Sequence, residues 1–363
     1  MIEQQRRAIR VVAWPRWFDN PYLPNLVDGL NREGLRSDSA HLLLTAAMRL
    51  RAGDWLHVHW PGETHTHAAR WRYQRGARAV DAQLRALKRR GVRIAWTAHN
   101  LLPHDDPHPD LGHRARSNLL DVVDHVFVHF EGAQAELTRE FGYSGPCTVV
   151  HHPNYVDAYP APPSQRAARD ELGLPADGFV ALAFGLIRPY KGIDTLVDAF
   201  GRCAGKNDRL VIAGAPEGAV HSTLEIAAAD PRIVLHARKV PNARVPTYFA
   251  AADVATIAHR AFFTSGSALL SLSMGCPIVG PPVNHLADLA GGDRLFPAET
   301  SADGLADALC RARDQSSHVD RVAIRNWAVG HGSWQTATDT IAATLCGHPD
   351  GQTGDGHGWL AAN

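Results

Sequence analysis

The stretch "AFGLIRPYKGIDTLVDAF" (residues 183–200) decides the fold of this chain. It overlaps the end of an apolar, strand-like run, "FVALAF" (179–184), and continues into an amphipathic helical pattern. Gly185 lets the backbone approach a ligand closely, and Arg188 and Lys191 place two cations where the helix begins. Cations there oppose the helix dipole, so the arrangement predicts an anionic ligand between them and the exposed backbone N–H groups.

The alternation of short apolar runs and helical stretches continues through the chain. The ten expected strands are 9–14, 55–60, 92–99, 125–130, 147–152, 179–184, 209–214, 232–237, 253–258 and 277–280. Strands that alternate with helices predict βαβ units and parallel sheets. The proline-rich segment 152–165 suits an interdomain connection better than a helix or a central strand. The sequence therefore predicts an α/β fold of two doubly wound, Rossmann-like domains that face each other across a cleft.

A second stretch, "AHRAFFTSGSALLSLSMGCPIVGPP" (258–282), predicts the partner of this anion-binding element. An apolar helix is expected over 267–273, followed by a short strand. Three hydroxyls and a glycine stand at its start: Thr264, Ser265, Gly266 and Ser267. One hydroxyl would suffice to cap the helix, whereas the whole set is typical of a cradle for phosphate oxygens. Arg260 could add a bidentate contact, so the two stretches together predict a diphosphate-binding site.

Composition and motifs narrow the function classes. The 363-residue chain has a formal net charge of zero at pH 7, which argues against a nucleic-acid-binding protein. It lacks a GxxxxGK[ST] loop and a GxGxxG after the first strand, which argues against a P-loop hydrolase and a dinucleotide oxidoreductase. Despite 21 histidines, no HExxH or Cys/His ligand spacing is present, so no metal site is expected.

The expected compartment follows from the cysteines and the apolar runs. Five scattered cysteines without CxxC spacing are typical of reduced thiols. No apolar run is long enough to span a bilayer, and the first residues lack the apolar core of a signal peptide. We therefore expect a cytoplasmic protein that can still touch the inner face of the membrane. The polar, glycine-rich tail 347–363 is expected to be disordered.

Four motifs resemble those of the GT-B glycosyltransferases, specifically the glycosyl transferases group 1 superfamily. They are "NPYLPNLVDGL" (20–30), "LHVHWPGE" (56–63), "WTAHNLLPHD" (96–105) and "FGLIRPYKG" (184–192). Within the superfamily they are similar to bacterial exopolysaccharide enzymes such as the xanthan β-mannosyltransferase. The resemblance implies an acceptor-binding domain at 1–160, a nucleotide-sugar-binding domain at 161–325 and a helix at 326–346 that crosses back to the first domain. It also implies a nucleotide-diphospho-sugar co-substrate without any further cofactor, and a saccharide or glycolipid acceptor.

One departure from the superfamily pattern bears on the mechanism. Retaining members carry two glutamates at the positions that are Phe262 and Leu270 here, and residues 258–282 contain no acidic residue at all. The sequence therefore favours an inverting transfer, in which a general base takes the proton of the acceptor hydroxyl. The base is expected at the end of an N-terminal strand, as Glu63 or Asp19, and the resemblance places His99 beside the donor sugar.

The acceptor is expected to meet the loops after the N-terminal strands. The expected acceptor-binding residues are Asn20, Tyr22, Trp60 and Asn100. Beside them, the helical stretch 69–91 holds eight Lys or Arg residues and a single acid. It is interpreted either as a core-facing helix with a solvated basic face, or as a helix that docks on anionic lipid.

The sequence leaves two alternative functions open. A sugar-nucleotide 2-epimerase would use the same two-domain fold and would turn over the nucleotide-sugar without an acceptor. A catalytically inactive partner of another transferase would bind the donor without transferring its sugar, and the missing glutamate pair motivates this alternative. The sequence does not decide between GDP-mannose and a UDP-sugar as the donor.

Overall fold

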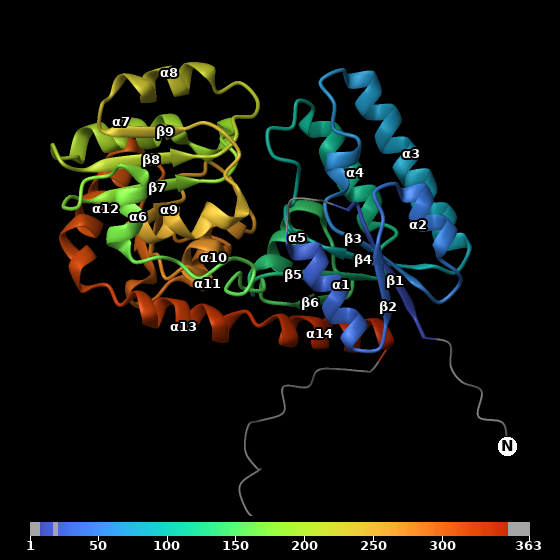
Figure 1. The fold of residues 1–363 in the computed structure, drawn as a ribbon. Coiled ribbons are helices and arrows are strands. Elements are labelled where there is room, and N and C mark those ends of the chain that lie inside the picture. Colours follow the sequence, from blue (N-terminus) through green and yellow to red (C-terminus); the bar gives the residue numbers. More distant parts are fainter. Residues whose placement is uncertain (1–7, 17–20, 348–363) are drawn as a thin grey trace, which may run out of the picture.

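The computed structural model describes residues 8–16 and 21–347, which form two α/β domains (Figure 1). Each domain is built on a six-stranded sheet in which every paired strand runs parallel to its neighbour. The expected class, two doubly wound α/β domains, is confirmed by this topology. Asp19, Asn20 and all but the first residue of the tail 347–363 lie outside the described residues.

The N-terminal sheet has the strand order β2-β1-β3-β4-β5-β6. Its strands are β1 (Arg10–Trp14), β2 (Arg36–Ser39), β3 (Trp55–Val58), β4 (Arg93–Thr97), β5 (His125–Val128) and β6 (Cys147–Val149). Its helices are α1 (Tyr22–Arg32), α2 (Leu43–Arg49), α3 (Arg70–Arg89), α4 (Pro109–Leu120) and α5 (Ala133–Phe141). Ile94 and Trp96 of β4 pack in the core on one face of the sheet, and Ala95 packs in the core on the other. Burial on both faces is what a central parallel strand requires.

The C-terminal sheet has the order β12-β11-β10-β7-β8-β9. Its strands are β7 (Val180–Phe184), β8 (Arg209–Ala213), β9 (Ile233–His236), β10 (Val254–Thr256), β11 (Ile278–Gly280) and β12 (Leu295–Pro297). The helices that accompany it are α6 (Gln165–Leu172), α7 (Ile193–Cys203), α8 (His221–Ala229), α9 (Val245–Ala251), α10 (Gly266–Ser273), α11 (His285–Leu289), α12 (Ala302–Gln315) and α13 (Arg321–His331). Along β7, Ala181 and Leu182 enter different cores, so this sheet is also buried on both faces.

The sequence does not predict two of the strands, β2 and β12, and both lie at a sheet edge. β2 reads "RSDS", four polar residues without an apolar pattern, and β12 has only three residues. An edge strand pairs on one side only, and a short or polar edge discourages pairing with other chains. Apolar periodicity therefore finds the other ten strands of the described residues and misses these two.

The last two helices run from one domain to the other (Figure 1). Helix α13 packs against α10, whereas α14 (Trp334–Cys346) packs against α1 of the N-terminal domain. The indole Nε1 of Trp55 donates a hydrogen bond of 2.8 Å to the Leu345 carbonyl. Trp334 Nε1 donates a hydrogen bond of 3.0 Å to the carbonyl of Asn154, in the segment between β6 and α6. The domains are therefore linked at two places, and the boundary near residue 160 stays a prediction.

Candidate functional site

The two stretches predicted to bind a diphosphate come together at the end of β7. A Cβ atom built on Gly185 would lie 3.0 Å from Lys191 Nζ and 3.7 Å from Ser267 Oγ. Gly185 has a φ of +102°, a conformation that L side chains rarely adopt, so glycine is required on both counts. The ammonium group of Lys191 is buried and donates a hydrogen bond of 3.3 Å to the Phe184 carbonyl. A cation, a hydroxyl and exposed backbone therefore converge on one small space.

Burial alters the charge of Lys191. Loss of solvent, and secondly the neighbouring charge of Arg188, lower the pKa of Lys191 to about 8. Most of the ammonium groups are still protonated at neutral pH, but the positive charge is held without a carboxylate among the described ion pairs. A buried cation without a counterion gains more from an anionic ligand than an exposed one does.

The start of α10 shows which of its polar groups are free. Ser265 is the N-cap: its hydroxyl accepts a hydrogen bond of 3.2 Å from the Ala268 N–H, as the simpler interpretation of this serine requires. The Thr264 hydroxyl is buried and has no hydrogen-bond partner among the described residues. A Cβ on Gly266 would lie 3.3 Å from the Tyr155 hydroxyl, so the interdomain segment approaches the helix closely here. Thr264 and Ser267 are therefore the hydroxyls that remain for a ligand.

Arg260 is placed differently from its predicted role. Its guanidinium forms an ion pair with Asp194 and donates a hydrogen bond of 2.7 Å to the Pro189 carbonyl. The side chain is half exposed and lines a separate hollow beside Phe262 and Val283. Arg260 thus fastens the "RPYKG" loop to the end of β10, and we do not include it among the phosphate ligands.

An interdomain cleft of about 250 Å³ lies beside the Lys191 site. Its lining comes from both domains: Gly62, Glu63, Thr66, Pro103, His104, Asp105, Arg188, Glu217 and Gly218. Arg188 forms an ion pair with Glu217, and its charge also acts on Glu63 across the cleft. Partial loss of solvent in the cleft raises the pKa of Glu63, although the side chain is still exposed and the nearby Arg188 opposes this shift. The cleft therefore holds a carboxyl group whose basicity is increased, opposite a cation.

Aromatic pairs close the domains on each other. The His104 ring stacks on Tyr190 of the "RPYKG" loop, with ring centroids 4.0 Å apart and planes 4° from parallel. Deeper in the interface, Phe130 and Phe263 meet edge to face at 4.9 Å. The Glu131 N–H donates a hydrogen bond of 3.0 Å to the Asp288 carboxylate. These contacts hold the strand ends of the two sheets against each other.

The ends of the N-terminal strands carry buried histidines that are bonded in a chain. Desolvation lowers the pKa of His59, His99 and His129 well below the ordinary value, so each ring is neutral and has one N–H. His129 Nδ1 donates a hydrogen bond of 2.8 Å to the Val150 carbonyl, which leaves its Nε2 as an acceptor. His99 Nδ1 then donates to His129 Nε2 at 3.2 Å, and His59 Nδ1 donates to His99 Nε2 at 3.1 Å. Every hydrogen bond in the chain is thereby assigned a direction.

The expected acceptor residues lie within or next to these hydrogen-bonded histidines. Both ring nitrogens of His99 are engaged, and Trp60 stacks on its face at 4.2 Å, so no ring nitrogen is left for a sugar hydroxyl. Tyr22 is buried within the histidine cluster, 4.8 Å from the His99 ring. Asn100 and Trp60 are half-buried at the strand ends. The cluster is therefore interior, and the residues that line the cleft do not include Tyr22, Trp60 or Asn100.

The two positions that lack the glutamates differ in burial. Leu270 lies in the core beside Tyr155 and Tyr248, so it faces the protein interior. Phe262 is half-buried against His259, and its carbonyl accepts a hydrogen bond of 2.8 Å from the Asn284 side chain. Neither position offers a group that could attack or stabilise a sugar.

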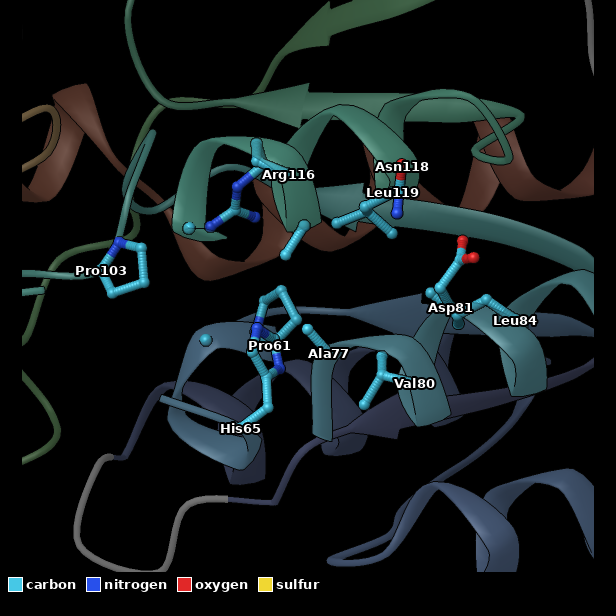
Figure 2. Close-up of a pocket in the computed structure, with 13 residues that line it drawn as sticks. Pro61, His65, Ala77, Val80, Asp81, Leu84, Pro103, Arg116, Asn118 and Leu119 are labelled. Carbon is cyan, nitrogen blue, oxygen red and sulfur yellow. The ribbon is translucent and has the colours of Figure 1, made fainter. Parts of the chain in front are cut away.

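A further pocket inside the N-terminal domain lies between α3 and α4 (Figure 2). Arg116 points into it, with its guanidinium 4.2 Å from the centre of the Trp96 ring and its Nε 2.7 Å from the Leu101 carbonyl. Burial lowers the pKa of Arg116 to about 9. The pocket shares Gly62 and Pro103 with the interdomain cleft, so Arg116 supports the loop that forms one wall of the cleft.

Comparison with known proteins identifies the class. Residues 178–315 match the family Glycosyl transferases group 1. The chain is 28% identical, over 74% of its length and 71% of the relative, to a GDP-mannose:glycolipid 4-beta-D-mannosyltransferase of Xanthomonas campestris pv. campestris. It is 27% identical, over 71% of its length and 61% of the relative, to a D-inositol 3-phosphate glycosyltransferase of Mycobacteroides abscessus.

Solved structures agree on the fold. Sucrose-phosphate synthase from Thermosynechococcus elongatus aligns with a TM-score of 0.73 at 16% identity, over 94% of this chain and 98% of that one. Anabaena HepE in complex with UDP and glucose aligns with a TM-score of 0.68 at 15% identity, over 94% and 100%. The fold and the matches together define a nucleotide-sugar-dependent glycosyltransferase. The protein is a glycosyltransferase with the GT-B fold, and its C-terminal domain carries the match to the group 1 family.

Proposed function

We propose that the protein transfers a hexose from a nucleotide-diphospho-sugar to a saccharide or lipid-linked saccharide, with inversion at the anomeric carbon. The donor is GDP-mannose or a UDP-hexose. The observation that carries the proposal is the convergence of Gly185, Lys191 and Ser267 beside a cleft that contains Glu63. This arrangement supports an anion-binding role for the C-terminal domain and a general-base role for Glu63 of the N-terminal domain.

The C-terminal domain would stabilise the leaving diphosphate. Lys191 and Arg188 supply positive charge, and the Ser267 and Thr264 hydroxyls with the backbone of α10 supply hydrogen bonds. Donors fixed in place before the reaction stabilise the charge that develops as the sugar–phosphate bond breaks. We propose that these groups replace a divalent cation on the diphosphate, so transfer needs no added Mg²⁺ or Mn²⁺.

Glu63 would act as the general base. It lines the cleft opposite Arg188, and partial loss of solvent there raises its pKa, which makes the carboxylate a better proton acceptor. The acceptor oxygen would attack the anomeric carbon while its proton passes to Glu63, and the diphosphate would leave with the bonding electrons. Asp19, the other candidate, lies outside the described residues.

Two observations support inversion. No carboxylate lies within 258–282, and Leu270 is enclosed in the core while Phe262 bonds through its backbone. The Xanthomonas relative, by its name, makes a β-mannosyl linkage from GDP-mannose. A single displacement on an α-configured donor would give a β-linked product here as well. The relatives named above are transferases, which favours transfer over epimerisation or an inactive binding partner.

The acceptor would be presented at the inner face of a membrane. No described helix has the length and apolarity to cross a bilayer. On α2, Leu44 and Met48 are one helical turn apart and are 64% and 75% exposed. The neighbouring α3 contributes Arg75 and Arg78, both exposed, whereas Arg85 is engaged by acidic side chains. Apolar side chains beside arginines are what binding to an anionic bilayer surface requires.

A donor panel tests the proposal. The full chain would be screened by thermal shift against GDP-mannose, UDP-glucose and other nucleotide-sugars, and the donor that stabilises it would be offered with lipid-linked saccharides. The anomeric configuration of the product would be read from its one-bond carbon–hydrogen coupling in NMR. A β-linked product formed without added Mg²⁺ or Mn²⁺ is expected. An α-linked product from an α-configured donor would overturn inversion, and a requirement for added Mg²⁺ or Mn²⁺ would overturn the role given to Lys191 and Arg188.

A further inference from the structure

The histidine cluster of the N-terminal domain has the ligand arrangement of a transition-metal site. His99, His129 and His152 are buried, and each offers a ring nitrogen within 4.8 Å of the other two. They come from three different segments: the ends of β4 and β5, and the segment after β6. We propose that this trio binds one Zn²⁺ ion, a function separate from the diphosphate site.

The hydrogen bonds of the trio orient the rings as metal ligands require. Metal-binding histidines almost always donate their other ring N–H to a carbonyl, a carboxylate or water. His129 Nδ1 donates to the Val150 carbonyl at 2.8 Å, and His152 Nδ1 donates to the Pro153 carbonyl at 2.9 Å. Both rings are therefore fixed with a lone pair on Nε2.

The third ligand, His99, completes the set through a change of tautomer. Its Nδ1 lies 3.2 Å from His129 Nε2, close to the separation of two nitrogens on a tetrahedral ion with Zn–N bonds of about 2.0 Å. When Nδ1 binds the ion, the hydrogen moves to Nε2, which can donate to His59 Nδ1 at 3.1 Å. His59 in turn carries its hydrogen on Nε2, an atom that is buried and has no partner among the described residues. The shift keeps every ring neutral.

The chemistry of the donor set selects the ion. Three neutral imidazoles suit Zn²⁺ and other transition ions, whereas Mg²⁺ and Mn²⁺ prefer oxygen ligands. Three protein ligands leave a fourth position for water or another ligand. The ion would join the ends of β4 and β5 to the interdomain segment, and the ring centroid of His285, in the C-terminal domain, lies 6.3 Å from that of His152. Domain opening would give the ion access.

Metal content tests the proposal directly. The full chain would be treated with a chelator, incubated with Zn²⁺ or Co²⁺, passed through a desalting column and measured by mass spectrometry for metal. We expect one ion per chain, with the intense visible absorption of tetrahedral Co²⁺. His129→Gln and His152→Gln are each expected to weaken binding by about tenfold or more. The matched control is His221→Gln, because His221 is exposed and pairs only with Glu225 among the described ion pairs.

Two outcomes would overturn the site. One is a wild-type chain that retains no stoichiometric ion after desalting; the other is equal binding by wild type and folded ligand variants. If the variants do not fold, X-ray absorption on the wild-type Zn²⁺ complex decides, because three imidazoles at about 2.0 Å are expected. A shell of oxygen ligands would then reject the proposal. Nucleotide binding at Lys191 is measured separately and does not enter this result.

Discussion

The two sheets are built alike, but the ends of their strands differ in charge. In the C-terminal domain, Lys191 keeps a pKa of about 8 and remains mostly protonated at neutral pH. In the N-terminal domain, His152 follows β6 and is buried so completely that its pKa falls to about 4. The strand ends of the C-terminal sheet thus carry a positive charge that attracts an anion, whereas the buried histidines at the strand ends of the N-terminal sheet are neutral and do not. Lys191 is buried as well, so the difference shows that a similar loss of solvent leaves an amine charged but an imidazole neutral, because the ordinary pKa of lysine is about four units higher.

The largest effect is expected from removing the base on the N-terminal side. Glu63→Gln should lower kcat by roughly 10²- to 10⁴-fold, because a glutamine cannot accept the acceptor's proton. Affinity for the nucleotide should be retained, since Glu63 lies opposite the diphosphate site. Steady-state transfer assays and calorimetry with the nucleoside diphosphate would measure the two quantities. Glu131→Gln is the matched control: this exposed glutamate also follows an N-terminal strand, and a loss of activity there instead would move the base to Glu131.

A smaller effect is expected when the positive charge of Lys191 is removed. Lys191→Met should weaken nucleoside diphosphate binding by about 10- to 150-fold, the cost of about 1.5–3 kcal/mol for a hydrogen bond to a charged group. Because the pKa of Lys191 in the free protein is about 8, wild-type affinity should be constant below that pH and fall above it, as the ammonium group loses its proton. Calorimetry at several pH values would measure this.

The control for Lys191→Met is Lys206→Met, which removes an exposed lysine of the same domain. Its affinity and its pH dependence should match those of the wild type. The Lys191→Met variant should bind weakly with little change between pH 7 and pH 9. A wild-type affinity that is flat through this range would contradict the contact between Lys191 and the diphosphate.

The smallest effect is expected at α2, where we propose that the N-terminal domain binds a membrane. Leu44→Ser combined with Met48→Ser should reduce binding to phosphatidylserine vesicles, on the order of tenfold, because two apolar side chains lose their burial. Binding of the wild type should also fade as salt rises past physiological strength. Ile226→Ser on α8, 63% exposed in the other domain, is the control in the same sedimentation assay. If neutral and anionic vesicles bind equally, the proposal that this surface binds an anionic membrane is contradicted.

The sequence predicts the fold well because parallel strands are buried on both faces and leave a strong apolar pattern. β2 escapes that pattern, since four polar residues at a sheet edge carry no apolar signal. The sequence predicts that Gly185, Lys191 and Ser267 converge, because each of the two motifs places anion-binding groups at the start of a helix. The sequence does not predict the ion pair between Arg260 and Asp194, because the two residues are 66 positions apart and leave no local pattern.

The histidine trio shows the same limit more sharply. His99, His129 and His152 each follow a strand, and the sequence marks them as polar residues at strand ends. Ligand spacing within one segment gives no metal signal, because the three residues come from three segments. Only the order β4-β5-β6 in the sheet brings them together. Which ring nitrogen is free depends on the carbonyls of Val150 and Pro153, and backbone positions of that kind are not encoded by residue type.

The return of α14 to the first domain has a consequence for biosynthesis. The apolar side chains of α1 share a core with Ile341 and Leu345, so the N-terminal domain cannot finish its core until α14 has left the ribosome. At translation rates of about 5–20 residues per second, that core stays partly uncovered for on the order of tens of seconds after its last strand is made. A nascent chain that stalls before residue 334 therefore presents an apolar groove along α1 to chaperones and proteases.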